Sequence, residues 1–258
     1  MTNCYLTGSR GFIGSYLRRY LEERGDTIVG TADYTDSPYK IPPQTEIVYH
    51  LGALVRPQES NLQSYRHPYF TKNVEAVVRI CAVVTDIAPR AKVVLFGSGG
   101  QDHLDSWYGY TKAMGELVGD AYAKLDGLQV YRLRLFGVTG VGKTGDVIND
   151  FAEQVVRDGQ IKHGKLDYLR DISDVRDMVP SIVEVVEKEK PGTYWMGRGQ
   201  GTFVRNIAEW FKVPLIHDST RDREEDYAHI SPEKRLLSSR PIEDTLEWVL
   251  NGHREAAK

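Results

Sequence analysis

The chain has 258 residues, 41% of them hydrophobic and 27% charged, with a formal net charge of −3. This composition is typical of a folded protein with one large domain, or with a core domain and a smaller lobe. The charge gives no basic surplus to hold a phosphate backbone, which excludes nucleic acid as an expected partner. The sequence shows no signal peptide and no apolar run of about 18 residues, so we expect a cytoplasmic protein without membrane contact.

The cysteines and histidines predict no metal site. Cys4 lies in the first apolar run and Cys81 in a helical pattern, and both are expected to be buried thiols of a reducing compartment. His163, His217 and His229 have no partners at the spacing of metal ligands.

Short β-branched runs alternate with helical patterns along the chain. In chain order, we predict a strand at 4–8, a helix at 11–25, strands at 27–32 and 46–53, a helix at 73–89, a strand at 92–98, a helix at 108–125, a strand at 129–136 and a helix at 146–159. After the segment 175–190, we predict a strand at 193–197 and helices around 203–211 and 242–250. Strands this apolar are buried on both faces, which predicts an α/β fold with a doubly wound parallel sheet.

The turn between the first strand and the first helix, LTGSRGFIG, carries Gly8, Gly11 and Gly14. Glycines let the backbone turn sharply and approach a pyrophosphate, which then lies against the positive end of the helix. The alternative is a tight turn closed by three glycines. An acid about 20 residues beyond such a motif commonly holds the adenosine ribose. Asp33 lies 19 residues after Gly14, which favours NAD and leaves NADP open.

The segment SWYGYTK places Tyr108 and Lys112 four residues apart, and therefore on one face of the predicted helix. An ammonium near a phenol stabilises the phenolate, so Tyr108 could exchange a proton with a substrate oxygen. Ser98 ends the strand KVVLFGS at the carboxyl edge of the sheet, where ligands of such folds bind. A surface pair of tyrosine and lysine is the alternative. The order of glycine-rich turn, serine and tyrosine–lysine pair favours a catalytic site.

These segments together resemble an extended short-chain dehydrogenase/reductase of the nucleotide-sugar epimerase/dehydratase family. The resemblance implies a Rossmann-like core at 1–136, joined by 172–197, and a small substrate-binding lobe at 137–171 and 198–258. The matching segments, in the family's order, are TGSRGFIG, YHLGA, Asn73 in KNVEA, Ser98, YGYTK, RLRLFG, RDISDVRD and GTYWMGRG.

The resemblance implies roles for the residues that match the family's motifs. Tyr108 is then the catalytic acid or base, Lys112 holds the nicotinamide ribose, and Ser98 binds the reacting sugar oxygen. Arg170 resembles the arginine that grips the nucleotide diphosphate, and Arg223 a second one, with a surface salt bridge as the alternative for both. The family also implies a nucleotide-sugar substrate and a homodimer. The expected cofactor-binding residues are Gly8, Ser9, Arg10, Gly11, Phe12, Ile13, Gly14, Asp33, Leu51, Gly52, Ala53, Asn73, Tyr108 and Lys112.

The chain also departs from the family pattern. Only 13 residues separate Ala32 from Glu46, where the family usually fits another helix and strand, so the adenosine side is expected to be shortened. Gly99 and Gly100 follow Ser98 where family dehydratases carry an acidic pair, which argues against dehydration. Gly137 stands where family members often have an asparagine that contacts the sugar nucleotide.

The segment GVTGVGKT, residues 137–144, matches the phosphate loop G-x-x-x-x-G-K-[ST] of ATPases and GTPases. An NTPase also needs a strand that ends in an acid to hold magnesium. The one good strand after Thr144, GTYWMG, ends in glycine. We therefore expect a glycine-rich connection beside the substrate, in which Lys143 approaches a phosphate or faces solvent, and keep a P-loop NTPase only as an alternative.

The resemblance implies NAD(P)-dependent hydride transfer at a sugar carbon, C4, of a nucleotide-activated hexose. A reductase and an epimerase would use the same residues, and RDISDVRD resembles the 4-keto-6-deoxymannose reductases slightly more than the galactose epimerases. A hypothesis of another class is a non-catalytic dinucleotide-binding sensor or scaffold, which the shortened adenosine side would suit.

Overall fold

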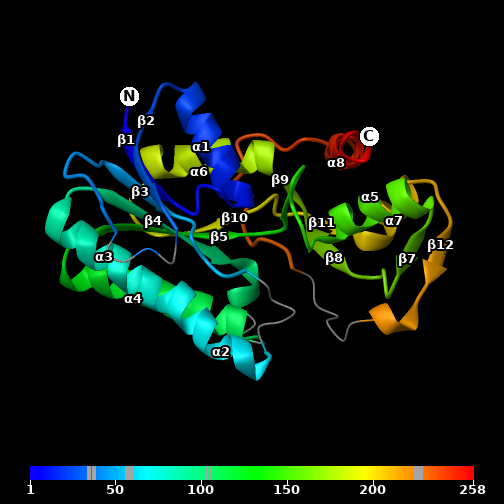
Figure 1. Ribbon diagram of the computed structural model, residues 1–258, viewed down its shortest axis with the longest axis horizontal. Helices are drawn as coiled ribbons and strands as arrows, with labels where there is room; N and C mark the ends of the chain where they lie inside the picture. Colours follow the sequence, from blue (N-terminus) through cyan, green and yellow to red (C-terminus); the bar gives the residue numbers. More distant parts are fainter. Residues whose placement is uncertain (34–35, 37–38, 56–60, 103, 105, 223–228) are drawn as a thin grey trace. The chain divides into compact units, whose positions relative to one another are not determined.

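Six strands form the main sheet of the structure, a computed structural model that describes residues 1–258 apart from 34–35, 37–38, 56–60, 103, 105 and 223–228 (Figure 1). All six were predicted from the sequence, and the α/β prediction with a Rossmann-like parallel sheet is confirmed. In spatial order the strands are β10 (Thr193–Met196), β5 (Gln129–Leu135), β4 (Lys92–Ser98), β3 (Ile47–His50), β1 (Asn3–Thr7) and β2 (Thr27–Ala32).

The strand order reverses between β1 and β3. From β1 the chain first moves outward to β2, then returns to β3 and continues through β4 and β5 on the other side. Ligands of open α/β sheets bind outside the carboxyl ends of the strands at such a reversal. Within the described chain β2 is the edge strand, and the described residues of 33–45 form no helix or strand. The expected shortening therefore falls on the side of β2.

Helices cover both faces of the sheet (Figure 1). One face carries α3 (Ala76–Ile87) and α4 (Trp107–Leu125), and the other carries α1 (Phe12–Glu23) and the second half of α6 (Val175–Lys188). The core under α3 and α4 is apolar, because alternate residues of each strand point to this face of the sheet and are hydrophobic. Its fully buried members include Val48, Ile80, Val84 and Val93.

The helix predicted at 73–89 begins earlier than expected. The chain first forms α2 (Gln63–Phe70), then a π-helix (η2, Thr71–Glu75), and only then α3. The prediction missed α2 because its sequence, QSYRHPYF, is polar and contains Pro68, which normally ends a helix. The π-turn has a consequence for the site, since it buries Asn73.

Contacts divide the chain into two units, Met1–Leu135 with Ile182–Tyr194, and Phe136–Ser181 with Trp195–Lys258. The predicted core segment 172–197 is thus divided, because 172–181 and 195–197 belong with the second unit and only 182–194 with the first. The assignment of substrate binding to the second unit stays a prediction.

The described part of the second unit consists of short strands, the helices α5, α7 and α8, the first half of α6 and the short helix η4. The strands missed by the sequence analysis pair as three two-stranded sheets, in which two or three residues per strand give too short a pattern to detect. A core of apolar side chains from α5, α7 and α8, among them Ile148, Ile207 and Leu246, holds the unit together. Its elements are β6 (Val138–Thr139), α5 (Val147–Asp158), β7 (Ile161–His163), β8 (Leu169–Asp171), β9 (Ser173–Asp174), β11 (Gly201–Phe203), α7 (Val204–Trp210), β12 (Leu215–His217), η4 (Ser219–Arg221) and α8 (Ile242–Ala256).

Three buried aspartates of the segment RDISDVRD anchor the C-terminal part of this unit. Asp171, Asp174 and Asp177 are each at most 4% exposed. Because a buried carboxylate needs donors for its oxygens, each one recruits a later segment of the chain. Asp171 accepts hydrogen bonds from the backbone N–H groups of Arg198, Gly199 and Ser231, Asp174 from Thr245 of α8, and Asp177 from Ser238 and the N–H of Arg240.

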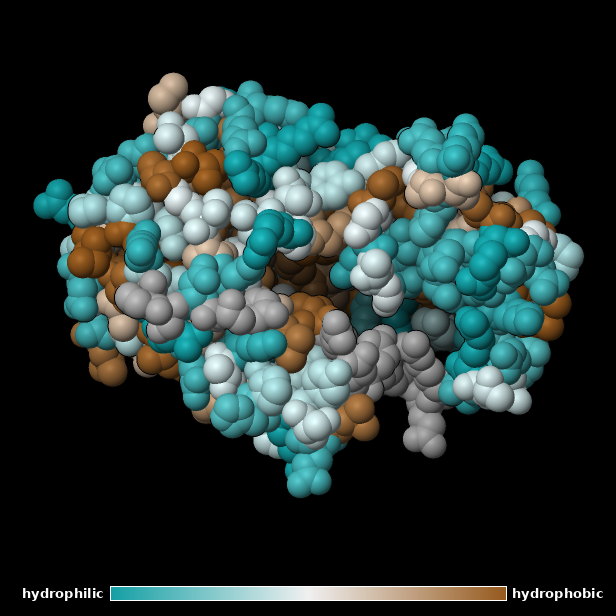
Figure 2. Space-filling model, viewed as in Figure 1, coloured by the Kyte–Doolittle hydropathy of each residue, from teal (hydrophilic) through white to brown (hydrophobic). Residues whose placement is uncertain are grey.

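Hydrophilic side chains dominate the face of the molecule shown in Figure 2, with apolar patches between them. Among the described helices, none combines the length and apolarity that crossing a membrane requires.

We expect Asp171→Asn to lower the free energy of unfolding by about 3 kcal/mol, because one accepting oxygen becomes a donor that faces backbone N–H groups. For a chain of this size that corresponds to a fall in Tm of roughly 6–12 °C in a calorimetric scan. The matched control is Asp167→Asn, whose side chain is 73% exposed and pairs with Arg205. The control should stay within about 1 kcal/mol of the wild type. Equal losses in both variants would contradict the anchoring role.

Candidate functional site

The turn between β1 and α1 has no room for side chains at two of its glycines. Gly8 has a φ of +68°, and a Cβ there would lie 2.8 Å from the backbone nitrogen of Gly52. A Cβ on Gly14 would lie 2.1 Å from the carbonyl oxygen of Gly8. Gly11 is the N-cap of α1 and has no side chain that could cap the first turn. The turn therefore presents backbone amides at a helix start, the arrangement that binds a pyrophosphate.

Asp33 directly follows β2 and forms an ion pair with Arg10 of the glycine-rich turn. The Arg10 side chain is 83% exposed, and that of Asp33 32%. In dinucleotide-binding folds an acid near this place holds the ribose hydroxyls of NAD, whereas an arginine accommodates the 2′-phosphate of NADP. The structure thus brings together one group suited to each dinucleotide, and the preference for NAD stays a prediction.

The loop after β3 is held by a buried threonine and a buried histidine. The hydroxyl of Thr7 accepts a hydrogen bond from the N–H of Gly52 at 3.0 Å and lies 2.8 Å from Nδ1 of His50. Burial, together with the positive charges of Lys112 and Arg79, lowers the pKa of His50 to about 3. His50 is therefore neutral at physiological pH and supports the loop.

Asn73 fixes the next part of the same loop. Its side-chain oxygen accepts from the N–H of Leu54 at 2.8 Å, and its amide nitrogen donates to the Leu54 carbonyl at 3.1 Å and to Thr111 at 3.2 Å. The amide is thus committed to protein groups that join the loop to helix α4. Asn73 was predicted to bind the cofactor, and in the structure it shapes the loop that carries the predicted residues Leu51, Gly52 and Ala53.

The structure brings Ser98 and Tyr108 together by a hydrogen bond between their side chains. Tyr108 lies in the first turn of α4, which Ser106 caps by accepting the N–H of Gly109, and Ser98 is the last residue of β4. Burial raises the pKa of Tyr108 to about 12, and the hydrogen bond to Ser98 opposes that rise. The ring of Tyr69 packs edge-on against Tyr108 with centroids 6.3 Å apart. A protonated, oriented phenol at a strand end is suited to donate a proton.

Comparison with known proteins identifies the family. The sequence profile of the NAD dependent epimerase/dehydratase family matches residues 4–197. The chain belongs to this family. It is 24% identical to Protein CapI of Staphylococcus aureus over 245 residues, covering 74% of this chain and 72% of CapI.

Solved structures of this family share the fold over the whole chain. The UDP-glucose 4-epimerase of Thermotoga maritima, solved with UDP-glucose, has a TM-score of 0.82 at 20% identity and full coverage of both chains. RMD from Pseudomonas aeruginosa, solved with NADPH, has a TM-score of 0.79 at 18% identity, covering 99% of this chain and 100% of RMD. At such identities the likeness establishes the fold alone. The cofactor of the family is a nicotinamide dinucleotide, NAD(P), and the glycine-rich turn of this chain fits its pyrophosphate.

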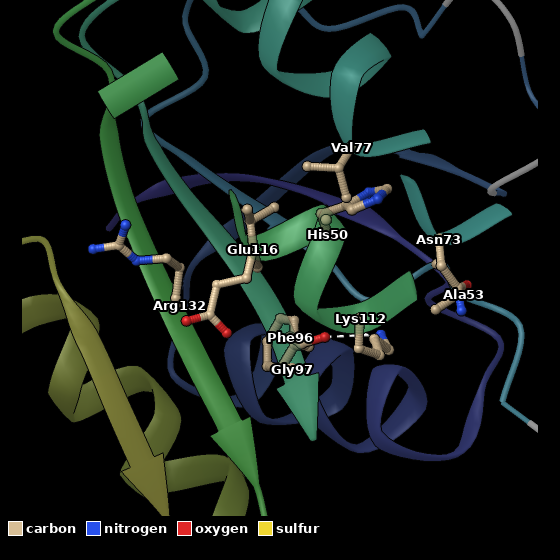
Figure 3. A pocket seen from close by; sticks show the side chains of 12 residues that line it. His50, Ala53, Asn73, Val77, Phe96, Gly97, Lys112, Glu116 and Arg132 are labelled. Atoms are coloured by element: carbon tan, nitrogen blue, oxygen red, sulfur yellow. Dashed lines mark hydrogen bonds between the residues drawn. The ribbon is translucent and has the colours of Figure 1, made fainter. Parts of the chain in front are cut away.

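Lys112, the second residue of the predicted catalytic pair, donates a hydrogen bond to the Phe96 carbonyl at 2.8 Å, as Figure 3 shows. Burial lowers the pKa of Lys112 to about 8. Among the described residues, those that shift the pKa of Tyr108 are Ser98 and Tyr69, so the expected tuning of the phenol by Lys112 is not seen in this arrangement. A cavity of about 20 Å³ lies beside Lys112, with His50, Asn73 and Glu116 among its lining residues. It has room for a water molecule but not for a substrate.

Helix α4 carries these residues on a face that approaches its neighbours closely. A Cβ on Gly115 would lie 2.7 Å from the carbonyl oxygen of Asn73, and one on Gly119 would lie 2.4 Å from a methyl group of Leu95. The two glycines continue the face of Tyr108 and Lys112 at helical spacing. They let the helix lie against the sheet at the distance that brings Tyr108 to Ser98.

Of the two arginines predicted to bind the diphosphate, the structure describes Arg170. Arg170 is in β8 of the second unit, where its guanidinium donates to the Leu169 carbonyl and stacks on Tyr168 at 4.4 Å from the ring centroid. Arg223 lies outside the described residues. The roles of both arginines stay predictions.

The segment 137–144 does not form a phosphate loop. Strand β6 interrupts it and pairs with β9, and α5 begins only at Val147, capped by Asp146. A phosphate loop instead wraps its backbone amides around the phosphates and continues directly into a helix. Only glycine fits at position 137, since a Cβ there would lie 1.7 Å from the carbonyl oxygen of Asp171. The geometry therefore argues against the NTPase alternative.

Two site residues were missed by the sequence analysis. Thr7 ends a buried strand, where a polar residue is a detectable signal that was not used. Tyr69 lies in the undetected helix α2, so only its position in the structure brings it to Tyr108.

The buried neutral His50 predicts a specific acid sensitivity. An unfolded histidine takes up a proton below pH 6.5, whereas folded His50 does so only near pH 3. As the pH falls from 6.5 toward 3, the free energy of unfolding therefore decreases by up to about 1.4 kcal/mol per pH unit. His50→Gln should remove that slope while the carboxylates still titrate. Urea unfolding of both proteins from pH 7.5 to pH 4 measures the difference. Parallel curves for the two proteins would contradict the neutral, buried state.

Proposed function

We propose that the protein transfers hydride at a sugar carbon, C4, of a nucleotide-activated hexose, as a reductase or an epimerase. The observation that carries the proposal is the hydrogen-bonded pair of Ser98 and Tyr108 at the carboxyl edge of the sheet, one helical turn before Lys112. The edge is the place where ligands of this fold bind, and the glycine-rich turn of the same unit suits the dinucleotide.

Each residue of the pair has a distinct task. Tyr108, with its pKa raised to about 12, holds its proton at neutral pH and donates it to the carbonyl oxygen of a keto sugar. Ser98 orients the phenol and offers its hydroxyl to the same sugar oxygen. Lys112, with a pKa of about 8, is charged at neutral pH and is proposed to hold the nicotinamide ribose. The nicotinamide supplies or accepts the hydride at the sugar carbon.

Dehydration is not part of the proposal. The short helix η3 (Gly99–Asp102) begins with Gly99 and Gly100, which bring no carboxylate to the two positions after Ser98. Elimination of water needs a base to remove a carbon-bound proton and an acid for the leaving hydroxyl. Arg170 is proposed to bind the diphosphate of the substrate, and a cytoplasmic location is proposed on sequence grounds alone.

Tyr108→Phe should lower turnover at least about a hundredfold, because it removes the proton donor and leaves the ring in place. Turnover is measured on a panel of UDP-, GDP-, CDP- and dTDP-hexoses and their 4-keto derivatives, with NADH or NADPH. The matched control is Tyr110→Phe on the same helix, whose side chain is exposed. Near wild-type turnover in Tyr108→Phe would remove the mechanism.

The same panel separates the remaining hypotheses. Net consumption of NADH indicates a reductase, whereas interconversion of two sugars without net consumption indicates an epimerase. A protein that binds NAD(H) but turns over no member of the panel, and is stabilised thermally by none, would be a dinucleotide-binding sensor or scaffold.

We further propose a homodimer formed through helix α4. Its outward face carries Tyr110, Met114 and Leu117, which are 45%, 36% and 69% exposed and lie at i, i+4 and i+7. An apolar stripe of this kind on a helix favours contact with a second apolar surface.

Leu117→Glu is expected to shift the mass measured by light scattering after size-exclusion chromatography from dimer to monomer, since it places a charge in the contact. Leu237→Glu, at a site 54% exposed in the second unit, should leave the dimer intact. A monomeric wild type, or a dimeric Leu117→Glu variant, would contradict the proposal.

A further inference from the structure

The last residues of β4 extend beyond the end of the neighbouring strand β3. The pairing of β3 with β4 ends at His50 and Leu95, whereas β4 continues to Ser98 beside β5. Beyond Leu95 the backbone groups that point toward the side of β3 need other partners. Such groups occur at alternate residues, here the carbonyl of Phe96 and the N–H of Ser98.

Two side chains satisfy these groups in place of a strand. Lys112 donates to the Phe96 carbonyl at 2.8 Å, and Gln101 accepts the N–H of Ser98 with Oε1 at 2.9 Å. Gln101 lies in η3 and is 3% exposed. Its side chain folds over Gly97, where a Cβ would lie 2.5 Å from that Oε1. The end of β4 is therefore shaped around the Gln101 side chain.

The nitrogen of the Gln101 amide also has a hydrogen-bond partner. Its Nε2 donates to the carboxylate of Glu116, one turn beyond Lys112 on α4. Arg134 of β5 donates to both oxygens of the same carboxylate, at 3.0 and 2.8 Å. The Glu116 and Arg134 side chains are only 14% and 20% exposed, which strengthens the pair relative to one in water. One chain of hydrogen bonds thus runs from β5 through α4 to Ser98.

We infer that Gln101 is a positioning residue for the reaction, which fixes Ser98 through Glu116 and Arg134. Ser98 in turn holds Tyr108, so the network sets the geometry of both groups that meet the substrate oxygen. Gln101 itself does not touch the reacting atoms in this role. It occupies the third position after Ser98, beyond the two glycines, and its amide can both accept from Ser98 and donate to Glu116.

The kinetic consequence rests on the proposed function. Gln101→Ala should lower kcat about 10- to 100-fold and change KM less than about threefold, because it disturbs the alignment of Ser98 and Tyr108 but removes no contact with the substrate. Gln101→Glu alone places two carboxylates against each other and should be at least as impaired.

The test exchanges the amide and the carboxylate between positions 101 and 116. In the double variant Gln101→Glu/Glu116→Gln, the new carboxylate accepts from Ser98 and from the amide nitrogen at 116. The amide oxygen at 116 still accepts from Arg134 Nη2, whereas the bond from Arg134 Nε is lost. This variant should recover part of the lost kcat and exceed both single variants by at least about threefold. A role in stability alone would not produce recovery of kcat at unchanged Tm, so Tm is measured for each variant.

Hydrogen exchange at the Ser98 amide gives a readout that needs no substrate. Exchange, measured by NMR or by mass spectrometry with residue-level fragmentation, should be at least about tenfold faster in Gln101→Ala and return toward the wild-type rate in the double variant. Unchanged exchange in Gln101→Ala would overturn the inference, whatever the activity. Faster exchange in an enzyme that turns over no nucleotide sugar would support the positioning of Ser98 and count against the proposed function instead.

Discussion

The candidate site depends on the close approach of helix α4 to the end of strand β4. Gly115 and Gly119 permit the approach because any side chain there would meet Asn73 or Leu95. Acidic side chains on the same helix then fix its register against β5. Glu116 binds Arg134, and Asp120 binds Arg132 at 2.6 Å. Four helical residues rise about 6 Å and two strand residues about 6.6 Å, so the two ion pairs match in spacing.

This register decides which group of the helix meets which group of the strand. With the two ion pairs in place, Lys112 lies at the Phe96 carbonyl and Tyr108 at Ser98. The end of β4 that extends beyond β3 is completed on that side by side chains from α4 and η3 rather than by backbone. The same arrangement that satisfies the backbone therefore organises the groups proposed to act on the sugar oxygen, and stability and function rest on shared contacts.

In the second unit, buried aspartates add to the apolar core. The three acids of RDISDVRD each collect donors from segments 27 to 71 residues away in sequence. In the sequence these acids belong to a segment that matches the family, and the structure shows that they hold the C-terminal segments in place. The adjacent Arg170 donates to the Leu169 carbonyl and stacks on Tyr168, and its role in binding the diphosphate stays a prediction.

The sequence by itself determined the parallel sheet, the glycine-rich turn and the strand-to-helix order, because periodicity and glycine placement are local properties of the chain. It also placed Ser98, Tyr108 and Lys112 correctly on β4 and α4. It could not determine the partner of Lys112 or the clamp formed by Asn73. It also left open the geometry of 137–144, whose letters match a phosphate loop while its backbone pairs as β6. These features depend on which strand extends beyond its neighbour and on how closely a helix packs against the sheet. Both are decided by contacts between segments that are distant in the sequence.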